Sequence, residues 1–157
     1  MTRKQKGFSL IELLIVVAII LIIAAIAIPN LLRARIAANE ASAVGSVRTI
    51  NTAQVSYFTA YGNPVLAIGY GTLAQLGGAA PCNAPTVNAG CYIDEILTAG
   101  TKSGYTFTET ASPTAYTTTA NATTLNVTGH RGFFSDESGV IRVNPAGAGA
   151  TVGSSPI

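Results

Sequence analysis

The hydropathy pattern of the chain is dominated by an uninterrupted run of sixteen apolar residues, Leu13 to Ile28. The wider stretch from Phe8 to Ile28 has 21 residues. As a helix it would be about 32 Å long and would cross the ~30 Å hydrocarbon core of a bilayer. One acidic residue, Glu12, stands directly before the run. The pattern therefore predicts a membrane-spanning helix over residues 8–29.

After Pro29 the pattern becomes amphipathic, with one stripe recurring at steps of three and four residues. This stripe consists of Ala43, Val47, Ile50, Gln54, Phe58 and Tyr61, and other faces carry Arg35, Asn39, Glu40 and Ser46. We expect a helix over residues 30–61 that packs its stripe against a folded domain and stops at Gly62-Asn63-Pro64. Pro29 lacks a backbone donor and is expected to kink the helix or melt it locally.

From Tyr105 onward the periodicity falls to two, which is typical of strands. A small antiparallel sheet is predicted over residues 105–143, ending in a hairpin whose turn runs from Ser135 to Gly139. Residues 62–104 are rich in Gly and Pro and predict a loop-rich connection with one short helix near residues 91–97. The Gly-, Ala- and Ser-rich tail, residues 144–157, is expected to be flexible. The predicted fold class is α+β, a long N-terminal helix packed against a small antiparallel sheet.

The residues before the apolar run predict how the chain enters a membrane. Arg3, Lys4 and Lys6 precede the run, and the positive-inside rule keeps this end cytoplasmic. Cleavage between Gly7 and Phe8, residues 1–7 being the leader, would leave the apolar run on the mature chain. An alternative is a signal-peptidase site at Ala25-Ile26-Ala27, which would release a soluble protein beginning at Ile28.

Glu12 has two interpretations. A carboxylate in a membrane span costs roughly 2.5–3.5 kcal/mol unless it is paired. Cleavage after Gly7 would create a new amino group at Phe8, one helical turn from Glu12. Alternatively, Glu12 extends to the cytoplasmic interface of a permanent anchor.

The segment around Glu12 resembles a known family. The sequence Lys6-Gly7-Phe8-Ser9-Leu10-Ile11-Glu12-Leu13 resembles the leader and N-terminal helix of type IV pilins and of the related type II secretion pseudopilins. The resemblance is densest from Arg3 to Asn30, and weaker patches at 102–107 and 131–142 resemble the sheet strands. It implies cleavage between Gly7 and Phe8, N-methylation of Phe8, and pairing of Glu12 with the Phe8 amine of a neighbouring subunit.

The same resemblance implies partners and a location. The partners are other copies of the chain, other pilin-like subunits, a prepilin peptidase that is also an N-methyltransferase, and an inner-membrane assembly platform with a cytoplasmic ATPase. Membrane lipid surrounds the helix before assembly. The subunit would lie in the bacterial inner membrane with its C-terminal domain in the periplasm, and then in an extracellular pilus or a periplasmic pseudopilus.

Cys82 and Cys91 are the only cysteines and are separated by eight residues. In an exported chain such a pair indicates a disulfide that closes a surface loop. A metal site is the alternative, but the chain has no second cysteine pair and a single histidine, His130. The disulfide is the favoured prediction.

Other candidate chemistry is weak. Without the leader, six basic residues face seven acidic ones, so no basic patch indicates nucleic acid. Asp136-Glu137 is interpreted as a surface turn rather than a calcium site, and the sequons at Asn121 and Asn126 are short patterns in a Thr-rich segment. His130, which precedes a predicted strand, is interpreted as a solvated or packed residue rather than a catalytic one, and no cofactor or enzyme activity is expected.

Three functions remain open from the sequence. The first is a structural subunit of a type IV pilus-like filament, a surface appendage for adhesion or motility. The second is a pseudopilin of type II secretion. The third, of a different class, is a soluble secreted binding module released after Ala27.

Overall fold

The computed structural model describes residues 7–63, 66–78, 82 and 84–157. The leader charges Arg3, Lys4 and Lys6 and the predicted helix stop at Pro64 lie outside the described residues. The chain divides into two compact units, Met1–Arg35 and Ile36–Ile157, and helix α1 (Leu10–Tyr61) has residues in both.

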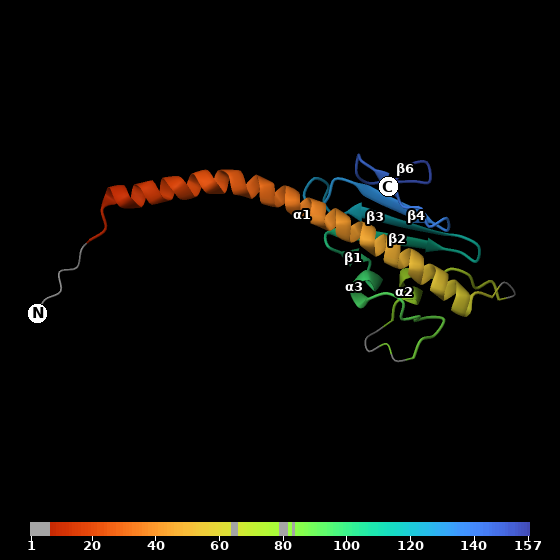
Figure 1. Ribbon diagram of the computed structural model, residues 1–157. Helices are drawn as coiled ribbons and strands as arrows, with labels where there is room; N and C mark the ends of the chain where they lie inside the picture. Colours follow the sequence, from red (N-terminus) through yellow and green to blue (C-terminus); the bar gives the residue numbers. More distant parts are fainter. Residues whose placement is uncertain (1–6, 64–65, 79–81, 83) are drawn as a thin grey trace, which may run out of the picture. The chain divides into compact units, whose positions relative to one another are not determined.

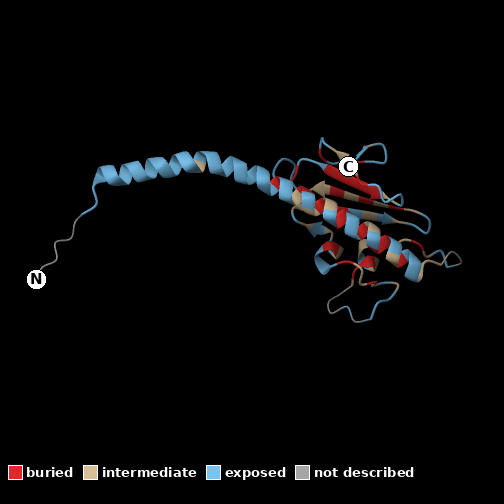
Figure 2. Ribbon diagram, in the orientation of Figure 1, coloured by how far each residue is buried: buried red, intermediate tan, exposed pale blue. Residues whose placement is uncertain are grey.

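In the first unit, α1 exposes its apolar side chains. Leu13, Ile20 and Ile26 are 60%, 57% and 64% exposed, and Figure 2 shows this part of the helix as exposed almost throughout. Among the described residues, α1 is the helix that is long and apolar enough to cross a membrane. The helix continues through Pro29, so local melting is not observed, and a kink at Pro29 stays a prediction.

In the second unit, α1 is amphipathic as predicted (Figure 2). Its buried residues are Ile36, Glu40, Ala43, Ser46, Val47, Ile50, Ala53, Gln54 and Tyr57. Two details of the prediction are wrong. After Gln54 the stripe continues at Tyr57, a step of three, whereas Phe58 is 44% exposed and contacts Tyr70 with ring centroids 5.0 Å apart. Glu40 and Ser46, placed on other faces by the pattern, are buried.

The predicted sheet is present and has six antiparallel strands in chain order. They are β1 (Thr101–Lys102), β2 (Tyr105–Ala111), β3 (Tyr116–Ala122), β4 (Gly132–Asp136), β5 (Arg142–Asn144) and β6 (Ser155–Pro156). Phe107 pairs with Ala120, and Ala120 with Phe133, so these side chains share one face. That face packs with Val47 and Ile50 of α1 in the hydrophobic core, and Figure 1 shows α1 lying along the sheet. The α+β fold class is confirmed.

The sheet extends beyond the predicted boundaries at both ends. β1 precedes residue 105, and β6 pairs with β5 through Arg142–Pro156 and Val143–Ser155. Ile157 N–H also donates to the Ile141 carbonyl at 3.0 Å. The end of the chain is therefore an edge strand, although its composition predicted a flexible tail. Two-residue strands leave no periodicity from which to predict them.

The connection between α1 and the sheet contains two single-turn helices, α2 (Leu73–Leu76) and α3 (Glu95–Thr98). Thr72 and Gln75 form a capping box at α2. Asp94 caps α3 by accepting from Leu97 N–H at 2.7 Å and pairs with Lys102 at 2.6 Å. The helix predicted near residues 91–97 thus begins only after Asp94, because the first residues of that stretch serve as loop and cap.

Cys82 and Cys91 form the predicted disulfide, with their Cα atoms 5.8 Å apart. The residues on both sides of Cys91 are bonded to the end of α2. Gly90 N–H donates to Gln75 O at 2.7 Å and Tyr92 N–H to Leu76 O at 2.7 Å. Tyr57 of α1 donates its hydroxyl to the Val87 carbonyl at 2.6 Å. Helix α1 therefore supports the loop directly.

A buried amide of α1 links three segments. Gln54 Nε2 donates to the Gly71 carbonyl at 2.6 Å and to Glu109 Oε1 at 2.5 Å, and Gly71 N–H donates to Gln54 Oε1 at 2.9 Å. The second Glu109 oxygen accepts from Thr118 Oγ1 at 2.5 Å. Burial nevertheless raises the pKa of Glu109 to about 7, and the bonds from Thr118 and Gln54 only partly oppose it.

The double substitution Cys82→Ser, Cys91→Ser should lower the melting temperature of the protein in detergent without preventing its membrane insertion. A disulfide around so short a loop contributes about 2 kcal/mol, which corresponds to several degrees in a unit of this size. Circular dichroism of the oxidised protein and of the variant measures the difference. An unchanged melting temperature would mean that the backbone bonds to α2 hold the loop without the covalent link.

The stability of the sheet unit should depend on pH through Glu109. Its folded-state pKa, about 7, lies above the ordinary value, so its contribution is full below about pH 4.5 and is lost as pH rises through 7. Between pH 5 and pH 8 the protein should lose on the order of 2 kcal/mol of stability, or roughly 5–10 °C in melting temperature.

The matched variant is Glu109→Gln, an uncharged amide that keeps one acceptor toward Gln54 and gains a donor toward Thr118. Its melting temperature should vary much less over the same pH range. Glu40 and Asp94 have lowered pKa values, so their contributions to stability are lost only below about pH 4. They therefore do not change the stability between pH 5 and pH 8. Equal pH dependence in both proteins would exclude Glu109 as its source.

Candidate assembly site

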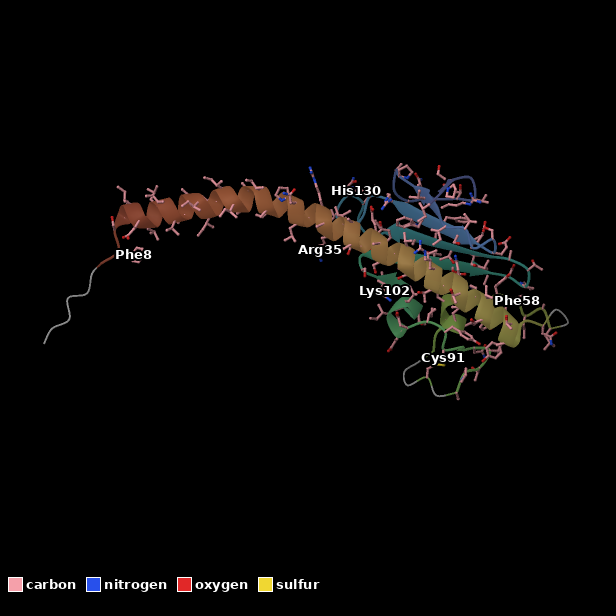
Figure 3. All side chains as sticks on the ribbon, viewed as in Figure 1. Phe8, Arg35, Phe58, Cys91, Lys102 and His130 are labelled. Atoms are coloured by element: carbon pink, nitrogen blue, oxygen red, sulfur yellow. A yellow bond between two sulfur atoms is a disulfide. The ribbon has the colours of Figure 1, made fainter. Side chains whose placement is uncertain are left out.

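The N-terminal turn of α1 brings the predicted cleavage junction and Glu12 close together. Gly7 and Phe8 lie just before the helix, separated from its first residue, Leu10, by Ser9, and the Phe8 side chain is 82% exposed (Figure 3). Ser9 N–H donates to Glu12 Oε2 at 3.3 Å, and Leu13 N–H donates to the Ser9 carbonyl at 3.2 Å. Glu12 thus caps its own helix, where the positive end of the helix dipole also favours a carboxylate.

In the described part of the chain, Glu12 has no cationic partner. Its single recorded bond comes from an exposed backbone group, so one oxygen remains for a further donor. A capping carboxylate at the start of an apolar helix is suited to form an ion pair with a cationic group from outside the subunit.

The rest of the segment offers a continuous apolar surface. Large hydrophobic residues from Phe8 to Leu32 are all exposed, including Leu10, Val17, Leu21 and Leu32. Exposed apolar area of this extent marks contact with a membrane or with another protein.

Glu40 fastens the sheet to α1 near the start of the second unit. Only 6% exposed, it accepts from His130 N–H at 2.8 Å, from Arg131 N–H at 3.1 Å and from Arg131 Nε at 2.7 Å. Burial alone would raise the pKa of Glu40, but these donors outweigh it and lower the pKa. The neighbouring Tyr105 donates to the Arg131 carbonyl at 2.8 Å, and its pKa is raised to about 12, first by burial and then by the charge of Glu40.

Sequence reasoning did not identify this ion pair. No local signal links Glu40 to Arg131, because 91 residues separate them. Gln54 did carry a signal, since it is a polar residue inside an apolar stripe, and a buried amide requires partners.

The other candidate residues lie apart from the assembly segment in the sequence. His130 Nδ1 lies 2.8 Å from Asn126 Oδ1 within one turn, an arrangement without a nucleophile. Asp136 accepts from Ser138 N–H at 3.0 Å, which is the turn geometry expected for Asp136-Glu137. No group of residues suited to hold a metal ion occurs among the described residues. Asn121, the first sequon residue, lies in β3.

Comparison with known proteins adds to this geometry. The prokaryotic N-terminal methylation motif matches residues 2–28. A stretch of 56 residues, 36% of the chain, is 46% identical to the type IV major pilin protein PilA of Myxococcus xanthus, of which it covers 26%. A stretch of 38 residues, 24% of the chain, is 68% identical to the type IV wide pilus major component PilA4 of Thermus thermophilus, of which it covers 29%.

The chain therefore spans little more than a quarter of the length of these curated relatives. No solved structure matches it significantly. The motif nevertheless covers the Gly7–Phe8 junction, Glu12 and the apolar run together. The methylation motif and the two relatives show that the N-terminal segment of this chain is similar to that of type IV pilins, and the α+β fold is consistent with this similarity.

Proposed function

We propose that the protein is a structural subunit of a type IV pilus-like filament, assembled from the inner membrane by packing of its N-terminal helix. The observation that carries the proposal is the exposed apolar surface formed by Phe8 and by α1 from Leu10 to Leu32. A single subunit in water cannot cover this surface. Lipid covers it before assembly, and neighbouring copies cover it afterwards.

The proposed maturation begins at the N-terminus. A prepilin peptidase removes residues 1–7 by cutting between Gly7 and Phe8, and the same enzyme methylates the new amine of Phe8. Residues 8–29 then form the membrane and assembly helix with a bend at Pro29, and residues 30–61 support the sheet. The N-terminus faces the cytoplasm, and the later part of the chain faces the periplasm, as the leader charges favour.

Glu12 has a proposed role in extraction from the membrane. Its free oxygen accepts a hydrogen bond from the Phe8 amine of the neighbouring copy. This ion pair neutralises both charges as the helix leaves the headgroup region. An assembly platform with a cytoplasmic ATPase supplies the work of extraction. The filament serves adhesion or motility, and the subunit itself has no catalytic role.

The alternatives receive less support. A type II secretion pseudopilin would use the same assembly segment, but both curated relatives are named as major pilus components. Release after Ala27 as a soluble binding module would discard nearly all of the matched motif, residues 2–28. It would also leave the Gly7–Phe8 junction and Glu12 without any use.

The mature chain should begin at Phe8 and carry one additional methyl group on its amine. Intact-mass analysis of filaments sheared from the cell surface measures both features in one spectrum. The physical reason is that only cleavage ahead of the apolar run keeps this run in the mature subunit. A mature chain that starts at Ile28 would overturn the filament proposal.

Glu12→Ala should insert normally into the membrane and assemble poorly. Removing the carboxylate makes insertion easier by a few kcal/mol on transfer scales, so a loss of filaments cannot be attributed to failed insertion. Filament yield is compared at equal membrane levels of the subunit, with Glu95→Ala, an exposed acid outside the segment, as the control. A wild-type yield from Glu12→Ala would contradict the pairing role.

A further inference from the structure

The outward face of α1 in the sheet-bearing unit has few polar groups available for a partner. Its hydroxyl side chains donate to carbonyls one turn earlier in the same helix: Thr49 to Gly45, Thr52 to Arg48, Ser56 to Thr52 and Thr59 to Val55, at 2.8–3.1 Å. The guanidinium of Arg48 is different. It is exposed and takes part in neither of the two ion pairs recorded for the described residues.

Arg48 borders a shallow groove of about 310 Å³. The groove lies between α1 and Tyr92, and its floor is formed by small residues of the helix, Thr49, Thr52, Ala53 and Ser56. The hydroxyls of this floor are already hydrogen-bonded within the helix. The groove therefore offers a cation beside an aromatic ring, which is suited to bind one carboxylate side chain.

A matching carboxylate lies on the β4–β5 turn. Glu137 is exposed at the tip and takes part in no ion pair within the described residues. The adjacent Asp136 is already used by Ser138, which donates to it from both its N–H and its hydroxyl. Glu137 is therefore the free charge of this turn.

Most of the groove lies on a different side of α1 from the turn. Asn51 Nδ2 donates to Ser135 Oγ at 2.8 Å and to the Gly139 carbonyl at 3.4 Å, so the turn lies on the Asn51 side. Thr49 and Ala53, two positions before and after Asn51, project about 200° away from it around the helix, whereas Arg48, three positions before Asn51, projects only about 60° from it and lies at the edge of the groove nearer the turn. Figure 1 agrees, with α2 and α3 on one side of α1 and β4 on the other.

Two different surfaces of a subunit that bind each other make a heterologous contact, which generates an open helical filament when the rotation does not close into a ring. We propose that the groove formed by Arg48 and Tyr92 binds the Glu137 carboxylate of a second copy of this chain, so that this ion pair fixes neighbouring sheet units in the filament. The inference rests on the proposed filament function and names the contact outside its apolar core. Tyr92 supplies the wall of the groove, and Arg48 supplies its charge.

Charge reversal in the full-length protein tests the pair. Arg48→Glu and Glu137→Arg should each reduce filament yield about tenfold, because each places like charges in contact. The combined swap should restore most of the yield. Glu95→Arg, which reverses an exposed acid outside the turn, is the matched control and should assemble normally. Melting temperatures in detergent should be unchanged for all four, because the altered side chains are exposed.

A crosslink gives a readout that does not depend on yield. Filaments of the double variant Arg48→Cys, Glu137→Cys should show a ladder of covalent multimers on non-reducing gels, whereas Arg48→Cys, Glu95→Cys should stay monomeric. Normal filaments from both single charge reversals, or equal ladders from the two cysteine pairs, would overturn the contact and leave the filament function standing. A wild-type protein that forms no filaments would instead overturn the proposed function itself.

Discussion

The rest of the structure depends on one constraint: a single helix, α1, lies in two different environments along its length. Because its backbone groups are hydrogen-bonded within the helix, the side chains alone determine whether each half is stable in lipid, in water or against protein. From Leu10 to Leu32 its large hydrophobic side chains are all exposed. From Ile36 to Tyr57 the buried stripe alternates small, aliphatic and polar residues. The first half requires a partner outside the subunit, and the second half has the sheet.

The attachment of the sheet combines apolar burial with a few buried polar contacts. Val47 and Ile50 fill the core under Phe107 and Phe133, but aliphatic contacts alone tolerate small shifts of a helix along a sheet. Glu40 and Gln54 remove that freedom, because each bonds backbone groups that a shift would leave unpaired. The contacts are spread over more than three turns of α1, so a sheet of six short strands is fixed on one helix.

Much of the fold could be predicted from the sequence, because in long periodic segments the spacing of apolar residues indicates which face is buried. The apolar run, the stripe through Val47 and Ile50, and the two-residue periodicity of β2 all depend on local spacing. Phe58 was misplaced because a step of three and a step of four from Gln54 fit the pattern equally well. Glu40 was misplaced because its partners His130 and Arg131 are distant in the sequence. β6 has two residues and was missed because so short a strand has no period.

The hydroxyl groups on the exposed face of α1 in the second unit are hydrogen-bonded within the helix, which makes this face suited to contact with another protein surface. Transferring a hydroxyl from water into a contact is costly unless it is hydrogen-bonded. Thr49, Thr52, Ser56 and Thr59 have already met that requirement inside the helix. Only 10% of the chain is charged, so few ions would be desolvated when copies associate. A surface of this kind gains little specificity from its hydroxyls. In the proposed filament, orientation would then come from shape and from the few free charges. This would give Arg48 and Glu137 an influence on assembly that a single exposed ion pair in a monomer would not have.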